Sequence, residues 1–138
     1  WRFVGAGIGL ANQSLMEAAS NDSVYISPGV MRYHPGVAKF WVQATTPAGV
    51  PTIQSSYNVT SVADPGAGGM TVTIATDFSS ANWCAWALAQ EDSSGTGLYA
   101  SQANGALAAG TIGVVAEDAS GTLVDPDCWH VGGFGDHA

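Results

Sequence analysis

Three short acidic groups are the residues of this chain that most resemble catalytic machinery. Glu91-Asp92 and Glu117-Asp118 are adjacent pairs, whereas one residue separates Asp125 from Asp127. Glycosidases hold two carboxyl groups about 5–10 Å apart around the bond that they cleave. Neighbouring residues of a strand point to opposite faces, so an adjacent pair does not by itself form that arrangement. We interpret these groups as acidic turns at strand ends and keep a small polysaccharide depolymerase as an alternative.

A metal site is the second chemistry that the residue types suggest. Asp125 and Asp127, followed by His130, offer two carboxylates and an imidazole. Their spacing matches neither a calcium-binding EF-hand loop nor a structural zinc motif. These three residues are therefore weak metal candidates, and the sequence predicts no cofactor.

Nucleophilic catalysis has less support. Ser, His and Asp are all present, but the chain has no Gly-x-Ser-x-Gly motif to expose a nucleophilic serine. Cys84 and Cys128 are the only cysteines, which is too few for a structural zinc site. They permit a single disulfide, or they are two small buried apolar side chains. We predict that the protein is not an enzyme.

Aromatic side chains offer sugar binding by stacking. The chain has five Trp and four Tyr, although most Trp in a small β-domain belongs to a core or an interface. Trp83 and Trp129 alternate opposite apolar or Cys positions, which makes them, with Tyr99, our candidates for glycan or receptor contact.

The distribution of charge narrows the choice of partners. The net charge is −8, and all three basic residues lie within the first 39 positions. Binding to phosphates requires several Lys or Arg, so nucleic acid and anionic membrane are poor partners. No stretch of 18 apolar residues exists, so we expect no membrane insertion.

The order of elements predicts a connector that leads into a β-domain. A capping box, Ser14 to Glu17, starts a short helix through Ala19, and a turn at Pro28-Gly29 follows. Pro35 holds His34 extended, and strands begin after Lys39. Residues 1–36 are the predicted connector, in which Met16, Glu17, Pro28, His34 and Pro35 are architectural.

Residues 37–138 are predicted to form one antiparallel β-sandwich, jelly-roll-like and all-β. Seven or eight short strands recur at about ten-residue spacing, which is typical of this class. The clearest alternation is Met70 to Thr76. Trp83 to Gln90 is apolar on both faces, which predicts a central strand or a subunit contact.

These motifs, taken in order, resemble bacteriophage tail fibres and related virion appendages. The similar pieces are Gln13-x-x-Met16-Glu17-Ala18, the Val24–Pro28 segment, His34-Pro35-Gly36 before a Lys-aromatic strand, and Gly121–Pro126. The resemblance covers nearly everything from Gln13 onward. Ile26-Ser27 departs from the usual Val-Thr, and Cys84, Cys128 and Trp129 lie outside the pattern.

The resemblance implies a homotrimeric fibre or spike module located in the virion. It implies contacts with other virion proteins through the N-terminal segment, and attachment to a host surface glycan or protein. A capsid decoration protein is the remaining alternative. A low charge content and strands that are apolar on both faces agree with a large self-interface.

Overall fold

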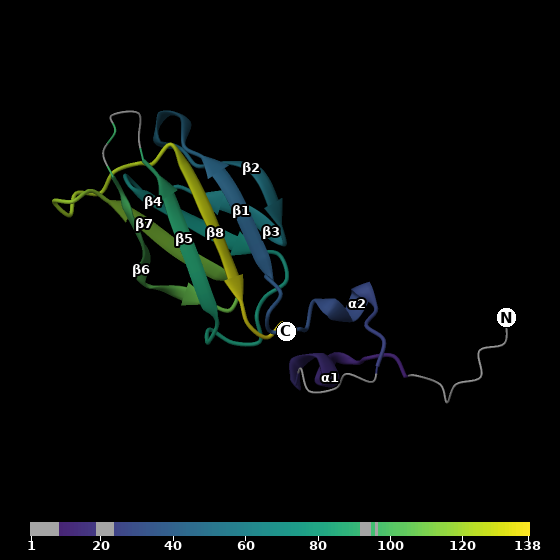
Figure 1. The fold of residues 1–138 in the computed structure, drawn as a ribbon. Helices are drawn as coiled ribbons and strands as arrows, with labels where there is room; N and C mark the ends of the chain where they lie inside the picture. Colours follow the sequence, from purple (N-terminus) through teal and green to yellow (C-terminus); the bar gives the residue numbers. More distant parts are fainter. Residues whose placement is uncertain (1–8, 19–23, 92–94, 96) are drawn as a thin grey trace.

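Two four-stranded antiparallel sheets face each other in the computed structural model, which describes residues 9–18, 24–91, 95 and 97–138 (Figure 1). The strands are β1 (Phe40–Thr45), β2 (Thr52–Tyr57), β3 (Val59–Ala63), β4 (Gly69–Ile74), β5 (Cys84–Gln90), β6 (Tyr99–Ala108), β7 (Thr111–Glu117) and β8 (Cys128–Phe134). One sheet has the order β2-β1-β8-β5 and the other β3-β4-β7-β6. The predicted all-β sandwich is confirmed.

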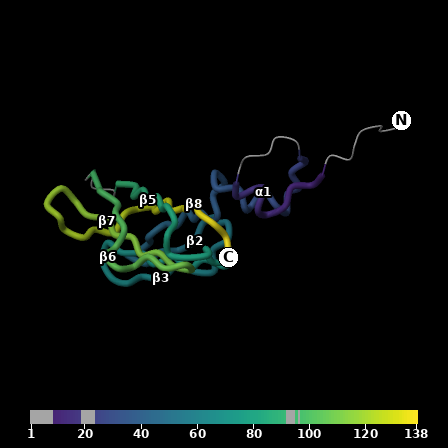
Figure 2. The backbone as a smooth tube through the Cα atoms, turned by 90° about the horizontal axis from the view of Figure 1, so that it is seen from below, coloured from purple at the N-terminus to yellow at the C-terminus, as the bar shows by residue number. Residues whose placement is uncertain are grey.

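The alternation of side chains explains why these strands form two layers. Phe40, Val42 and Ala44 of β1 point inward, as do Met70, Val72 and Ile74 of β4. Residues two apart on a strand share a face, so each of these sets forms one apolar surface. Packing the two surfaces together removes both from water. Figure 2 shows the resulting layers from below, with β5 and β8 in one and β3 and β6 in the other.

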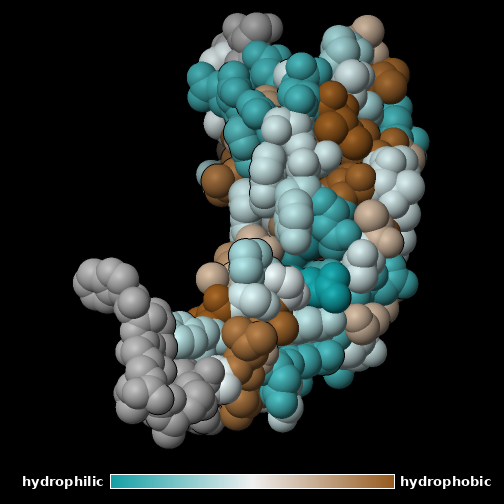
Figure 3. All heavy atoms as spheres, turned by 90° about the vertical axis from the view of Figure 1, so that its right-hand side faces the viewer, coloured by the Kyte–Doolittle hydropathy of each residue, from teal (hydrophilic) through white to brown (hydrophobic). Residues whose placement is uncertain are grey.

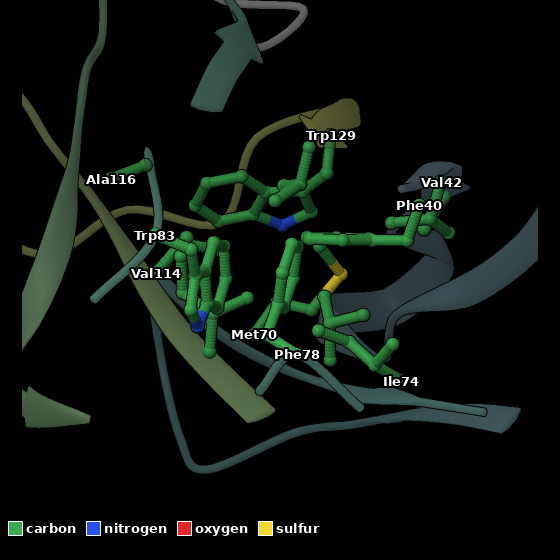
Figure 4. Close-up of a cluster of buried hydrophobic side chains, with 13 residues drawn as sticks. Phe40, Val42, Met70, Ile74, Phe78, Trp83, Val114, Ala116 and Trp129 are labelled. Atoms are coloured by element: carbon green, nitrogen blue, oxygen red, sulfur yellow. The ribbon is translucent and has the colours of Figure 1, made fainter. Parts of the chain in front are cut away.

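An aromatic cluster fills the end of the core nearest the C-terminus. Phe78 and Trp83 stack with ring centroids 4.4 Å apart, and Phe40 meets Trp83 edge-on at 5.6 Å. The indole N–H of Trp83 donates to the Ala108 carbonyl at 3.0 Å, which satisfies its only polar group. Figure 4 shows these rings in the larger apolar core, which also includes Trp129 and Met70. Such contacts add specificity to the apolar burial.

Gly133 of β8 is necessary for this packing. A Cβ there would lie 2.7 Å from Cε1 of Phe40 and 2.7 Å from Cζ3 of Trp83, because both rings close over the glycine. We expect Gly133→Ala to lower the free energy of unfolding by about 1–3 kcal/mol through overpacking. Urea denaturation measures the change. Gly97→Ala is the matched control, since nothing lies within 4 Å of its Cβ position; equal effects in both variants would contradict the packing explanation.

The N-terminal segment contains two short helices, α1 (Gln13–Ala18) and α2 (Pro28–Met31). Asn12 caps α1, because its Oδ1 accepts the Leu15 N–H at 3.0 Å. The predicted start at Ser14 is therefore wrong by two positions, because the amide side chain of Asn12 is an equally good cap. Met16 is buried, and Glu17 accepts a bond from Gln13 at 2.7 Å. Ala19, the predicted helix end, lies outside the described residues.

The predicted Pro28-Gly29 turn is instead the beginning of α2. Pro28 stands in the first turn of this helix, where its missing N–H costs nothing. His34 forms a local turn, since its Nδ1 accepts the Gly36 N–H at 3.0 Å. Pro35 beside it is exposed. The boundary at residue 36 stays a prediction; the first strand begins at Phe40.

A buried lysine joins the N-terminal segment to the sandwich. Nζ of Lys39 donates to the carbonyls of Arg32 and His34, the latter at 2.7 Å, so it holds the turn that follows α2. Burial lowers the pKa of Lys39, while the negative charges of Asp136 and Glu17 act in the opposite direction. The segment leaves the sandwich at the end where the C-terminus lies, as both Figure 1 and Figure 2 show.

His137 is buried at this junction and packs near Phe78. Burial lowers the pKa of His137 below its ordinary 6.5, and the positive charges of Lys39 and Arg32 act in the same direction. The folded state therefore favours the neutral imidazole, whereas the unfolded chain takes up a proton as the pH falls below 6.5. The stabilising effect is complete above that pH and is lost below it.

We expect the free energy of unfolding to fall as the pH drops below 6.5, and His137→Gln to reduce that fall. Urea denaturation at each pH measures it. The fall begins above the range in which Asp118 titrates, because hydrogen bonds lower its pKa from 3.8. His130→Gln serves as the control, because it removes a histidine near the start of β8, away from the junction where His137 lies. A pH dependence that is unchanged in the His137 variant would contradict the assignment.

Candidate functional site

Exposed aromatic side chains form a row across the outer face of the β2-β1-β8-β5 sheet. The strand register pairs Tyr57 with Trp41, Trp41 with Gly132, and Gly132 with Trp86. Trp41 and Trp86 are each 38% exposed and Tyr57 is 49% exposed. We call this set, with Gly132, the aromatic row.

Small inward residues on β5 explain why its large side chains face solvent. Ala85, Ala87 and Ala89 pack against the core, so the alternate positions, Trp86 and Leu88 among them, point outward. β5 is an edge strand of its sheet, so the prediction of a central position is wrong. Both faces of β5 are apolar here because alanines form its inner face and pack closely against the core.

Gly132 lets the Trp86 indole lie over β8. A Cβ at this position would lie 2.6 Å from Cζ2 and 2.7 Å from Cε2 of Trp86, so the indole occupies the space above the glycine. Trp41 and Trp86 stand on strands separated by β8, which places their backbones about 10 Å apart. The Trp86 indole therefore extends from β5 over β8, the strand that separates it from Trp41.

Polar, uncharged groups lie beside the aromatic row. The next register position brings together Ser55, Gln43, His130 and Leu88. Beyond it, the Gln54 amide donates to Thr45 Oγ1 at 2.9 Å. Of the outward side chains described on these four strands, none belongs to Lys, Arg, Asp or Glu. The outer face offers aromatic surface and hydrogen-bonding groups, which suits a neutral partner.

The structure corrects two of the three predicted contact residues. Trp129 is fully buried and Trp83 is 8% exposed, so neither is available to a ligand. Trp129 shares the inward face of β8 with Val131, and its neighbour Cys128 takes the other face. Tyr99 is exposed, as predicted, but it stands on β6 in the other sheet. Sequence reasoning missed Trp41 and Trp86; the alanines that alternate with Trp86 were the available signal.

The three candidate metal ligands, Asp125, Asp127 and His130, do not form a common metal site. Asp125 Oδ1 accepts the Gly68 N–H at 2.6 Å, which fixes a turn between β3 and β4. Asp127 is exposed, and Nε2 of His130 lies 3.7 Å from the Cys128 sulfur. Within residues 9–18, 24–91, 95 and 97–138, no three metal-binding side chains gather at one point. The site residues proposed below are therefore the aromatic ones.

Asp118, of the Glu117-Asp118 pair, makes the hydrogen bonds of a turn residue. Asp118 accepts from Ser120 Oγ at 2.6 Å, Ser120 N at 2.8 Å and Thr122 N at 2.9 Å. These hydrogen bonds lower the pKa of Asp118, whereas a general acid needs a raised one. Asp92, the partner of Glu91, lies outside the described residues.

The two cysteines are free and far apart. Their strands β5 and β8 are neighbours, but Cys84 pairs with Phe134 and Cys128 with Gln90, at opposite ends. Six residues of strand separate them by about 20 Å. A disulfide requires Cα atoms within about 7 Å, so the antiparallel register excludes a bridge between them, one of the two alternatives that the sequence left open.

We expect an alkylating reagent to modify one cysteine in the native protein and two after denaturation. Cys84 is exposed and Cys128 is buried, so only the former is accessible while the protein is folded. Mass spectrometry of peptides after labelling identifies the site. The variant Cys84→Ser removes the native label; labelling of Cys128 before unfolding would contradict the burial.

A cavity of about 200 Å³ opens where the two sheets part at β5 and β6. Its lining includes Ala85, Ala87, Ile112 and Val114, with Ser101 and Gln102 as polar members. No acid, base or thiol appears in the described lining, so we place the candidate site on the aromatic row.

Comparison with known proteins returned no matching family model, curated protein or solved structure. Among the described helices, none is long and apolar enough to cross a membrane. The function proposed below therefore rests on the residues, their geometry and the resemblance of their order.

Proposed function

We propose that this chain is a structural and adhesive module of a bacteriophage virion appendage, a fibre or spike. Its N-terminal segment would attach to other virion proteins, and its sandwich would contact the host surface. One observation carries this proposal: the molecule has two separate exposed surfaces. One is the group of apolar side chains on the N-terminal segment, and the other is the aromatic row on the β2-β1-β8-β5 sheet.

The N-terminal segment supports the attachment role. Four of its large apolar or aromatic side chains are exposed: Leu10, Tyr25, Ile26 and Met31. Figure 3 shows brown apolar spheres gathered at this segment, beside the residues drawn in grey. Exposed apolar groups concentrated on a short segment mark a contact with another protein. Lys39 fixes the start of β1 to this segment, so a partner bound there would hold the sandwich in place.

The outer face of the β2-β1-β8-β5 sheet supports the adhesive role. It is uncharged and rich in aromatic and amide side chains, although the chain carries a net charge of −8. A capsid decoration protein would also need contacts with itself and with the virion, but it would have no use for an exposed aromatic row. A depolymerase would need a pair of poised carboxyls, and the pKa of Asp118 is shifted in the opposite direction.

We further propose a homotrimer with a jelly-roll-like sandwich. Two sheets of four strands are common to such folds. However, β1-β2, β3-β4 and β6-β7 are hairpins within single sheets, so the strand pairing does not by itself identify a jelly roll. The jelly-roll description therefore stays a prediction. Closed cyclic symmetry would allow the exposed apolar groups of the N-terminal segments to cover one another around an axis.

We expect the full chain to sediment as a trimer at micromolar concentration. The double variant Ile26→Ser, Met31→Ser should weaken the trimer by roughly tenfold or more, because it removes apolar surface from the segment. Leu123→Ser is the matched control, since Leu123 is similarly exposed at the opposite end of the sandwich. Sedimentation equilibrium measures all three proteins. A native chain that stays monomeric at micromolar concentration would overturn the fibre proposal.

A further inference from the structure

We infer that the outer face of the β2-β1-β8-β5 sheet binds a neutral glycan chain laid across the strands along the aromatic row. This inference deepens the adhesive role and rests on the proposed function. It assigns the ligand class and the residues: Trp41 and Trp86 as stacking platforms, Tyr57 as a third, and Gly132 as the position over which the Trp86 indole lies.

The geometry of the row suits an extended ligand. Tyr57, Trp41, Gly132 and Trp86 occupy one register position on four successive strands, so they follow a single line perpendicular to the strands. Neighbouring strands are about 4.8 Å apart, so the row is about 14 Å long. That length exceeds one sugar ring. The C–H faces of pyranose rings pack on aromatic surfaces, and successive rings of a linear chain could meet successive platforms.

Gly132 lets the Trp86 indole lie over β8 as a platform. Any side chain at this position would meet the indole, whose Cζ2 lies 2.6 Å from the place of a Cβ. The indole would then be displaced from β8, and the aromatic row would lose its platform next to Trp41.

Charge selects a neutral ligand over an anionic one. Of the outward side chains described on the four strands, none is a Lys or Arg, and the chain has no Lys or Arg after Lys39. Sulfated, phosphorylated or uronic-acid polymers would therefore meet a net negative molecule without a cation to pair with. Sugar hydroxyls need only neutral donors and acceptors, which Gln43, Ser55 and His130 supply beside the row.

A second copy of the chain is the competing occupant of this face, and the same composition argues against it. The buried centre of a self-interface is richer in apolar surface than the protein exterior. Here, amide, hydroxyl and imidazole groups at the neighbouring register positions would have to be paired or desolvated. A glycan, in contrast, brings hydroxyl groups that pair with them directly.

The experiment titrates the full native chain with neutral hexasaccharides, namely cellohexaose, laminarihexaose, maltohexaose and mannohexaose, and with anionic hexagalacturonate. Isothermal titration calorimetry measures affinity, and tryptophan fluorescence reports stacking. We expect at least one neutral hexasaccharide to bind and the anionic one not to bind. Trp41→Ala and Trp86→Ala should each weaken binding by roughly tenfold or more, and Gly132→Val should abolish it.

Tyr99→Ala is the matched control, because Tyr99 is an exposed aromatic residue on the other sheet. It should leave affinity within about twofold of the native value. Urea denaturation of every variant separates loss of binding from loss of folding, and the two tryptophan variants keep the result interpretable if Gly132→Val does not fold.

Three outcomes would overturn the inference: no neutral hexasaccharide binds, Tyr99→Ala weakens binding as much as Trp86→Ala, or the tryptophan variants dissociate the oligomer without changing affinity. The last outcome would make the face a self-interface. If the chain is a trimer but binds no hexasaccharide, the glycan inference fails and the appendage proposal stands. If the chain is a monomer that binds a hexasaccharide, the appendage proposal fails and the glycan inference stands. Shortened hexasaccharides in mass spectra would identify an enzyme instead.

Discussion

Two consecutive glycines in β8 are the constraint on which the rest of the structure depends. Gly133 faces inward beneath Phe40 and Trp83, and Gly132 faces outward beside Trp86. Because neighbouring residues of a strand point to opposite faces, this pair lets aromatic rings close on both sides of one strand. The inner rings complete the core, and the outer ring ends the aromatic row. The same short segment therefore supports both stability and the candidate binding face.

The buried Lys39 holds the N-terminal segment to the sandwich. A fully buried ammonium group is costly unless it is hydrogen-bonded, and two backbone carbonyls of the preceding turn accept hydrogen bonds from it. Asn58 binds the Lys39 carbonyl from its side chain at 2.9 Å, and the Lys39 N–H donates to Gly133 at 2.8 Å. One residue thus connects the turn after α2, the bend between β2 and β3, and β8. A force transmitted through the segment would reach the sheet that carries the aromatic row.

The chemistry of the two ends agrees with a module that attaches by one surface and binds by another. Exposed apolar groups on the N-terminal segment suit a protein partner, whereas the sheet face combines aromatic rings with uncharged polar groups. Several carboxylates accept backbone N–H groups in turns, namely those of Asp64, Asp118 and Asp125. These carboxylates hold loops, and the outward side chains of the candidate face include none of them.

Hydrophobic alternation determined much of this protein without reference to tertiary contacts. The period of two in β1, β4 and β7 identifies strands and their inward residues, and the absence of crossover helices restricts the fold to antiparallel sheets. Local chemistry likewise predicts a connector over residues 1–36. The sequence does not determine which face of β5 turns inward, because both faces of that strand are apolar and the pattern alone is symmetric.

The volume of the side chains decided that question in the folded protein. The alanines of β5 and Gly133 of β8 fit the narrow space between the two sheets, so Trp86 is left on the outer face. Trp41 is also on the outer face, whereas Trp83 and Trp129 fill the interior. The strand register separated Cys84 from Cys128, although their strands are neighbours. The sequence by itself thus determined the strands and the chemical groups available. Only the three-dimensional packing decided which of those groups meet solvent, because burial depends on the shape of the residues opposite and not on the residue's own type.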